Sequence, residues 1–201
     1  MLKLKKVAVT GGIACGKSSI CQIFKKLGAY VISADEVVHH HLSNNSDLIE
    51  KVGDLLGNDV IVEGKIDRKA VADKVFLHPD LLNALERILH PEVEKEIEAQ
   101  FQKVKQKNKY PLFVAEIPVF FESDLGHASY DAVVVVEAPE DLCRERFKSK
   151  TGSTDEDFDR RVAFQVPLEE KVKQADFVIK NDKDIENLHK QLRAVYESLT
   201  S

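Results

Sequence analysis

The chain has 201 residues, of which 43% are hydrophobic and 31% are charged. This length supports one substantial hydrophobic core with room for an inserted subdomain, and the composition argues against a disordered chain. The formal net charge of −5 lacks the basic surplus of non-specific nucleic-acid binders, so we expect no nucleic acid as a partner. Three cysteines without a C-x-x-C pair argue against a disulfide framework and a zinc site. No apolar run reaches the length of a membrane span and no signal-peptide pattern precedes the first strand, so we expect a cytoplasmic protein without membrane contact.

The first motif is a glycine-rich turn between an expected strand and an expected helix. An apolar run at 7–9 precedes it, and apolar residues at helical spacing follow it over 19–27. Gly11 and Gly16, followed by Lys17 and Ser18, match the phosphate-binding pattern G-x-x-x-x-G-K-[ST]. Backbone N–H groups at such glycines turn toward an anion, Lys17 reaches the β- and γ-phosphates of ATP, and the Ser18 hydroxyl binds Mg²⁺. The residues expected to bind ATP here are Gly12, Ile13, Ala14, Cys15, Gly16, Lys17, Ser18 and Ser19. Cys15 is interpreted as a small residue beside the helix rather than as a redox group.

A second short strand is predicted at 30–33, and Asp35 follows its end. Ligands of open α/β sheets bind beyond the carboxyl ends of the strands, so Asp35 is expected at the same edge as the glycine loop and is a candidate for catalysis. Asp is also a favoured N-cap residue, and the position equally allows Asp35 to cap a helix over 36–42. The position alone leaves both interpretations open.

Residues 46–107 show helical patterns with almost no strand signal apart from a brief extended interruption at 60–62 and Gly64, which predicts a helical insertion in the core. Pro91 predicts a break between helices over 79–89 and 92–105, because proline disfavours helical geometry in the residue before it. The run His39–His41 is interpreted as a solvated stretch rather than a metal site, since consecutive helical residues point in different directions. Of the three, His39 is the one that we expect to face the site.

Two continuous apolar runs, 112–116 and 132–136, are typical of buried parallel strands, and 176–180 predicts a last strand before a closing helix over 184–199. Glu116 and Glu122 lie at and just beyond the end of the first run. They are candidates for binding a metal or a hydroxyl group, and ordinary loop charge is the alternative.

The stretch after Pro139 is helical and basic, with a turn at 151–155 that contains Gly152. A basic segment with such a hinge can close over phosphates, exclude water and bring cations to the charge that develops during transfer. A solvated helical hairpin is the alternative. We call residues 141–174 the lid segment. Its cations include Arg144, Arg146, Lys148, Lys150, Arg160 and Arg161.

An ordered set of segments along essentially the whole chain resembles the dephospho-CoA kinase family. Thr10–Ile13 with Gly16–Ser18 is similar to the family's phosphate loop, and Ala34-Asp35 is similar to its D-A-D element. The other similar segments are Leu89–Pro91, Ile117–Glu122, Arg161 with Gln165–Lys171, and Ala175–Ile179 with Asn181. The chain departs from the family pattern at Ser33 and Glu116, where Asp is usual, at Ala14-Cys15, where Gly-Ser is common, and at Lys150, where Arg is usual.

The resemblance implies ATP-dependent phosphorylation of the ribose 3′-hydroxyl of dephospho-CoA, which gives coenzyme A and ADP. ATP and dephospho-CoA are then the partners, and Mg²⁺ at Ser18 is the cofactor. Asp35 is implied as the base, with Lys17, Arg146, Lys150 and Arg161 as the other catalytic residues. The insertion is implied to help hold the CoA part, and Asn181 to lie near adenine and bind ATP. The residues implied to bind the acceptor are Asp35, His39, His90, Pro118 and Glu122.

These elements and the resemblance predict an α/β protein with a three-layer P-loop kinase fold, a parallel five-stranded sheet, a helical insertion and a basic lid. We expect a single domain over 1–201, with a core at about 1–35, 110–140 and 175–201, a helical substrate subdomain at about 36–109, and the lid. Two other functions share parts of the pattern: a kinase acting on another small hydroxyl or nucleotide acceptor, and a nucleotide-dependent switch that hydrolyses slowly. The sequence leaves open whether the protein is a monomer or a homo-oligomer.

Overall fold

The structure is a computed structural model that describes residues 3–123 and 127–201. The chain divides into two compact units, one formed by Met1–Ser33 with Ala99–Ser201 and the other by Ala34–Glu98. We call them the sheet unit and the helical unit. None of the helices within the described residues is both long enough and apolar enough to cross a membrane.

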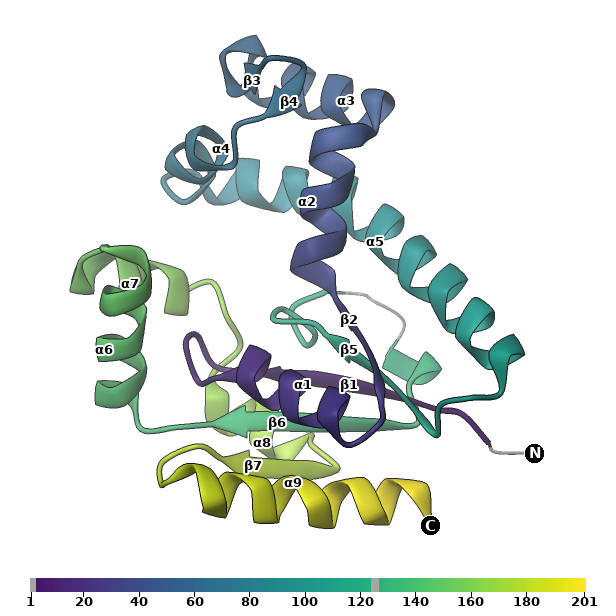
Figure 1. The fold of residues 1–201 in the computed structure, drawn as a ribbon. Helices are drawn as coiled ribbons and strands as arrows, with labels where there is room; N and C mark the ends of the chain where they lie inside the picture. The colour runs from purple at the N-terminus through teal and green to yellow at the C-terminus, as the bar shows by residue number, and fades with distance from the viewer. Residues whose placement is uncertain (1–2, 124–126) are drawn as a thin grey trace. The chain divides into compact units, whose positions relative to one another are not determined.

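The sheet unit contains five parallel strands in the order β2-β5-β1-β6-β7 (Figure 1). The strands are β1 (Lys5–Gly11), β2 (Tyr30–Ser33), β5 (Leu112–Glu116), β6 (Ala132–Glu137) and β7 (Phe177–Lys180). Parallel strands need long crossover connections, so each return of the chain to the sheet passes through helices or a long loop. The predicted five-stranded parallel sheet is confirmed.

Helices cover both faces of this sheet. Side chains of adjacent residues in a strand point to opposite faces. Val114 packs in a cluster with residues of α1 (Lys17–Lys26) and α9 (Ile185–Thr200), whereas the ring of its neighbour Phe113 lies 5.3 Å from the Phe101 ring of α5 (Pro79–Lys107). Helix α8 (Leu168–Lys173) contacts β6 and is drawn behind the sheet from α1 in Figure 1. The predicted three-layer α/β fold is therefore confirmed.

Two helices of the lid segment form a hairpin after β6. Helix α6 (Glu140–Thr151) ends at Gly152, whose φ of 69° is left-handed, and α7 (Asp155–Val162) begins after a capping box between Thr154 and Asp157. The turn that the sequence predicts at 151–155 is thus present, with Gly152 at the end of α6. A short 3₁₀ turn, η2 (His127–Ser129), precedes β6.

The helical unit has its own apolar cluster, in which Leu48, Val52 and Val71 are among the buried residues. Its elements are α2 (Ala34–Asn44), α3 (Ser46–Leu56), the 3₁₀ turn η1 (Asn58–Val60), the hairpin strands β3 (Ile61–Val62) and β4 (Lys65–Ile66), α4 (Arg68–Val75) and the first part of α5. Of the extended interruption predicted at 60–62, Ile61 and Val62 form the first strand of this two-stranded hairpin, whereas Val60 ends the 3₁₀ turn η1.

Two predictions about helix ends are wrong. Helix α5 continues through Pro91 instead of breaking before it. Proline there removes one backbone hydrogen bond, but Leu85 before it and Val93 after it are both buried, which stabilises the continuous helix. Helix α2 begins at Ala34, so Asp35 lies inside the first turn instead of at the N-cap position.

Candidate active site

The glycine loop at 11–16 connects the end of β1 to the start of α1. A Cβ atom on Gly11 would lie 2.1 Å from the carbonyl oxygen of Val136, and one on Gly16 would lie 2.2 Å from Nδ2 of Asn181. Gly16 also has a φ of 97°, which favours glycine. It is the N-cap residue of α1, and no side chain of the described residues caps that end. The first N–H groups of α1 are therefore oriented to bind an anion.

The Lys17 ammonium lies against this loop. Its Nζ donates to the carbonyl oxygen of Gly12 at 2.8 Å and to that of Gly11 at 3.4 Å. The side chain is only 9% exposed, so the charge is held at the loop rather than extended into solvent. A cation at the mouth of a ring of backbone amides is the arrangement that binds the β- and γ-phosphates of a nucleotide.

Ser18 and Glu116 bring a hydroxyl and a carboxylate together beside the loop. Ser18 Oγ donates to Glu116 Oε1 at 2.7 Å, and Glu116 is 8% exposed. Both supply oxygen, the ligand atom that Mg²⁺ prefers. In the described part of the chain, no three or more His, Cys, Asp or Glu side chains cluster as a metal site. Mg²⁺ in kinases needs only one or two protein ligands beside phosphate and water, so these two residues fit it.

Asn181 connects the loop to helix α6. It follows the last residue of β7, and its Nδ2 donates to the Cys15 carbonyl oxygen at 2.8 Å. Arg146 Nη2 donates to the Asn181 carbonyl oxygen at 3.3 Å, and Arg146 Nη1 is buried without a hydrogen-bond partner among the described residues. The structure thus brings together three of the predicted site residues, from the loop, the lid segment and the end of β7.

The other lid cations lie in different surroundings. The Arg161 guanidinium lies 5.2 Å from the centre of the Phe147 ring, and Lys150 is exposed on the last turn of α6. Arg144 forms an ion pair with Asp159 at 2.7 Å, which joins α6 to α7, and a second one with Glu140 at 2.5 Å within α6. Arg144 therefore stabilises the hairpin, whereas Arg146 reaches the loop through Asn181.

The predicted acceptor residues of the sheet unit lie after β5. The Pro118 carbonyl oxygen accepts a hydrogen bond from Thr10 Oγ1 at 3.2 Å. Glu122 Oε1 forms an ion pair with Lys171 Nζ at 2.6 Å and accepts from the Val166 N–H at 2.9 Å. Glu122 Oε2 is buried and has no hydrogen-bond partner among the described residues.

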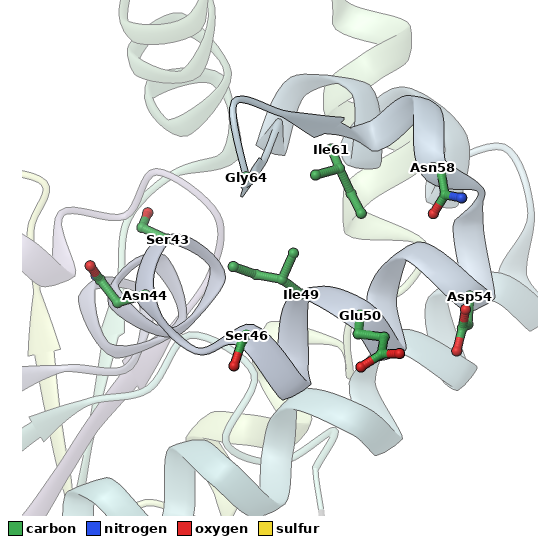
Figure 2. A pocket seen from close by; sticks show the side chains of 9 residues that line it. All are labelled: Ser43, Asn44, Ser46, Ile49, Glu50, Asp54, Asn58, Ile61 and Gly64. Carbon is green, nitrogen blue, oxygen red and sulfur yellow. The ribbon is translucent and has the colours of Figure 1, made fainter.

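The predicted acceptor residues of the helical unit lie on two helices. Asp35 is exposed in the first turn of α2, His39 is exposed one turn later, and His90 is half-buried on α5. The same unit contains a hollow of about 520 Å³ between the end of α2, α3 and the β3–β4 hairpin. Figure 2 shows Ile49 and Ile61 pointing into it among hydroxyl, amide and carboxylate groups.

Two residues near the site were missed by the sequence reasoning. Cys143 on α6 contacts Cys15 of the loop, with the sulfur atoms 3.1 Å apart, and Lys171 is the buried partner of Glu122. Neither belongs to a local motif that identifies its contact. The resemblance of Gln165–Lys171 to a family segment is the only signal in the sequence for Lys171.

Comparisons with known proteins agree with this geometry. The family model described as dephospho-CoA kinase matches residues 5–187. A dephospho-CoA kinase of Protochlamydia amoebophila is 45% identical over 99% of this chain and 98% of its own, and one of Chlamydia pneumoniae is 46% identical over the same shares. The solved structure of dephospho-CoA kinase from Campylobacter jejuni is similar with a TM-score of 0.70 and 31% identity, over 98% of each chain. With a family model that matches most of its length and full-length relatives of this similarity, the chain belongs to the dephospho-CoA kinase family.

Proposed function

We propose that this protein transfers the γ-phosphoryl group of ATP to the ribose 3′-hydroxyl of dephospho-CoA, giving coenzyme A and ADP in the last step of CoA biosynthesis. The observation that carries the proposal is the family match over residues 5–187. That range contains the glycine loop, Asp35 and the whole lid segment. The arrangement of Lys17, Ser18 and Glu116 at the loop gives the match a chemical basis.

The phosphates of ATP bind at the loop. The N–H groups of the loop and of the first turn of α1 donate to phosphate oxygens, and Lys17 leaves the loop carbonyls to bind the β- and γ-phosphates. Ser18 and Glu116 would hold Mg²⁺ there, directly or through water. When bound, Mg²⁺ neutralises charge on the β- and γ-phosphate oxygens.

Asp35 is the base. It follows Ser33, the last residue of β2, by two residues, and Ser33 pairs with Glu116 in the sheet. The Asp35 side chain is exposed, so an acceptor hydroxyl can reach its carboxylate. Arg146, Lys150 and Arg161 stabilise the transferred group, since cations placed on developing charge lower the barrier.

The helical unit holds the CoA part of the acceptor, with His39 and His90 as contacts. Pro118 and Glu122 bind the acceptor from the segment after β5, and Asn181 lies near adenine. The glycine loop and the lid segment bind ATP, so separate parts of the chain bind the two substrates. This division predicts that changes in the helical unit alter the KM for dephospho-CoA more than the KM for ATP.

The experiment that tests the proposal is a comparison of acceptors. Purified protein with MgATP is assayed against dephospho-CoA, adenosine, AMP, shikimate and gluconate at equal concentration, with the products identified by mass. We expect dephospho-CoA to be by far the best acceptor and coenzyme A to be the product. Comparable turnover with another acceptor would contradict the substrate, and slow ATP hydrolysis without transfer to any acceptor would favour a nucleotide switch.

The role of Asp35 is tested by Asp35→Asn. A positioned general base contributes about 10²–10⁴-fold, and loose phosphoryl transfer needs little early proton removal, so we expect kcat to fall toward the lower end of that range. The ATP dissociation constant should change little, because the lost contact is to the acceptor. Glu36→Gln is the matched control, since Glu36 is also an exposed acid in the first turn of α2. Activity of Asp35→Asn within about threefold of the control would rule out a general base there.

A further inference from the structure

Cys15 of the glycine loop and Cys143 of α6 form a buried pair of thiols. Their sulfur atoms lie 3.1 Å apart, and the residues are only 1% and 3% exposed. The phosphoryl transfer proposed above uses neither sulfur. The third cysteine, Cys21 on α1, lies beside the Glu116 carboxylate instead.

The surroundings make the two thiols different. The hydrogen bond from Cys143 and the charge of Lys17 lower the pKa of Cys15, which also immediately precedes the N-cap of α1. The contact with Cys15 and burial raise the pKa of Cys143. Cys15 is therefore the more acidic thiol of the pair and the one that forms a thiolate more readily.

We propose that Cys15 and Cys143 form a reversible redox modification site, at which a hydroperoxide oxidises the pair to an internal disulfide that weakens nucleotide binding at the glycine loop. The Cys15 thiolate attacks one peroxide oxygen, the O–O bond breaks, and the leaving oxygen takes up a proton as water or an alcohol. The resulting Cys15 sulfenic acid is attacked by the Cys143 sulfur, its S–O bond breaks, and hydroxide leaves with the Cys143 proton as water. Two thiols are oxidised by two electrons, and one peroxide is reduced.

The two sulfur atoms are close enough to form a disulfide, but forming it displaces the backbone of the glycine loop. A disulfide brings sulfur atoms to about 2.05 Å, so the two sulfurs must approach by about 1 Å. The Cys15 N–H donates to the Gly12 carbonyl oxygen at 3.4 Å, and the Cys15 carbonyl oxygen accepts from Asn181 at 2.8 Å. Moving Cys15 therefore disturbs the loop amides on both sides of it. The effect on nucleotide binding rests on the proposed function of this loop as the phosphate site.

Bound ATP should protect the pair. The neighbours Gly12 and Ala14 are half-buried, so Cys15 lies one layer below the loop surface over which the phosphates bind. A small oxidant enters through that surface when the loop is empty. This predicts that saturating MgATP slows oxidation of the pair, whereas a nucleotide-independent route would leave the rate unchanged.

The full chain, first reduced, is treated with hydrogen peroxide with and without MgATP, then unfolded and alkylated. We expect the mass to fall by two hydrogens, one thiol to be alkylated instead of three, and peptide mapping to join Cys15 to Cys143. Nucleotide affinity should fall about tenfold or more, since losing one hydrogen bond from a loop N–H to a charged phosphate oxygen weakens binding by about that much. Dithiothreitol should restore it. ATP that fails to slow the oxidation would overturn entry through the loop.

Two variants, each lacking one of the three thiols, test whether the effect is specific to the pair. Cys143→Ser should bind ATP normally when reduced but form no disulfide, and dimedone should trap its Cys15 sulfenic acid. Cys21→Ala, which removes a buried thiol outside the pair, should behave as the unaltered chain does. If peroxide oxidises a reference thiol peptide but leaves all three thiols of the chain open to alkylation, the redox site is refuted. If the disulfide forms but the affinity for ATP stays within about twofold of that of the reduced chain, the proposed effect on nucleotide binding is refuted. Reduced protein that binds no ATP would refute the proposed function, and the mass measurement would still decide whether the disulfide forms.

Discussion

The buried ion pair between Lys171 and Glu122 leads to a quantitative prediction of stability. The Lys171 Nζ and Glu122 Oε1 atoms are 2.6 Å apart, and the two side chains are only 1% and 11% exposed. Lys171 Nζ also donates to Gln165 Oε1 at 3.2 Å, and Glu122 Oε1 accepts from the Val166 N–H at 2.9 Å. The pair thereby joins α8 and the segment before it to the loop after β5.

The magnitude follows from distance and burial. At an effective dielectric constant of about 20, charges this close attract by about 6 kcal/mol, and the loss of hydration of both ions offsets much of that. The intact pair therefore contributes little net stability. Lys171→Met leaves the Glu122 charge buried without its cation, which should lower the free energy of unfolding by about 3–5 kcal/mol. That is a large part of the total of about 5–15 kcal/mol typical of a domain.

The assay is a double-mutant cycle with urea unfolding followed by circular dichroism. Lys171→Met combined with Glu122→Gln should recover most of the loss, because no charge is then left buried and the Gln oxygen still accepts from the Val166 N–H. Lys173→Met is the control on the same helix. Lys173 pairs with Glu170 at 2.6 Å, but the two side chains are 67% and 51% exposed, so its loss should cost less than about 1 kcal/mol. A cost below about 1 kcal/mol for Lys171→Met, or additive single changes in the double variant, would refute this reasoning.

Three further predictions concern the loop. Lys17→Ala should reduce phosphoryl transfer by about 10²-fold or more through loss of a charge on the phosphates, while circular dichroism shows an unchanged fold and unfolding shifts by less than about 1 kcal/mol; an unfolded variant would make the residue structural. Ala14 has a φ of 54°, which costs about 1–2 kcal/mol for a residue with a Cβ, so Ala14→Gly should stabilise the chain by about 0.5–1 kcal/mol after the entropy of glycine is subtracted; a loss measured by urea unfolding would contradict the strain. Glu116→Gln should raise the Mg²⁺ concentration for half-maximal activity about tenfold or more, which titration with Mg²⁺ measures; an unchanged value would remove Glu116 from the metal site.

The parts of the fold predicted from sequence are those set by neighbouring residues. The glycine loop was predictable because Gly11 and Gly16 determine its backbone and Lys17 and Ser18 follow directly. The three central strands, β1, β5 and β6, were predictable because parallel strands buried on both faces are continuous apolar runs. Strands β2 and β7 lie at the edges of the sheet and are less buried. The helix break predicted at Pro91 is wrong, because burial of Leu85 before it and Val93 after it outweighs the tendency of proline to interrupt a helix.

Contacts between distant segments could not be read from these patterns. Cys15 looked like a small loop residue, and only the packing of α6 brings Cys143 to it across 128 positions of sequence. Lys171 belongs to no local motif that indicates burial, yet it is 0% exposed. A buried cation is recognisable only when its partner is known, and here the partner lies on a different element.

The sheet topology explains why one edge collects the proposed chemistry. In a parallel sheet all carboxyl ends lie on the same side, and each end here leads to a residue with a proposed role. Strand β1 leads into the glycine loop, β5 ends at Glu116, and β7 is followed by Asn181. Strand β6 leads into α6, whose Arg146 donates a hydrogen bond to the Asn181 carbonyl oxygen. The Asn181 side chain in turn donates to the Cys15 carbonyl oxygen. A displacement of α6 can therefore alter the glycine loop through two sets of contacts between segments distant in sequence. One is the hydrogen bonds of Asn181, and the other is the contact between Cys15 and Cys143.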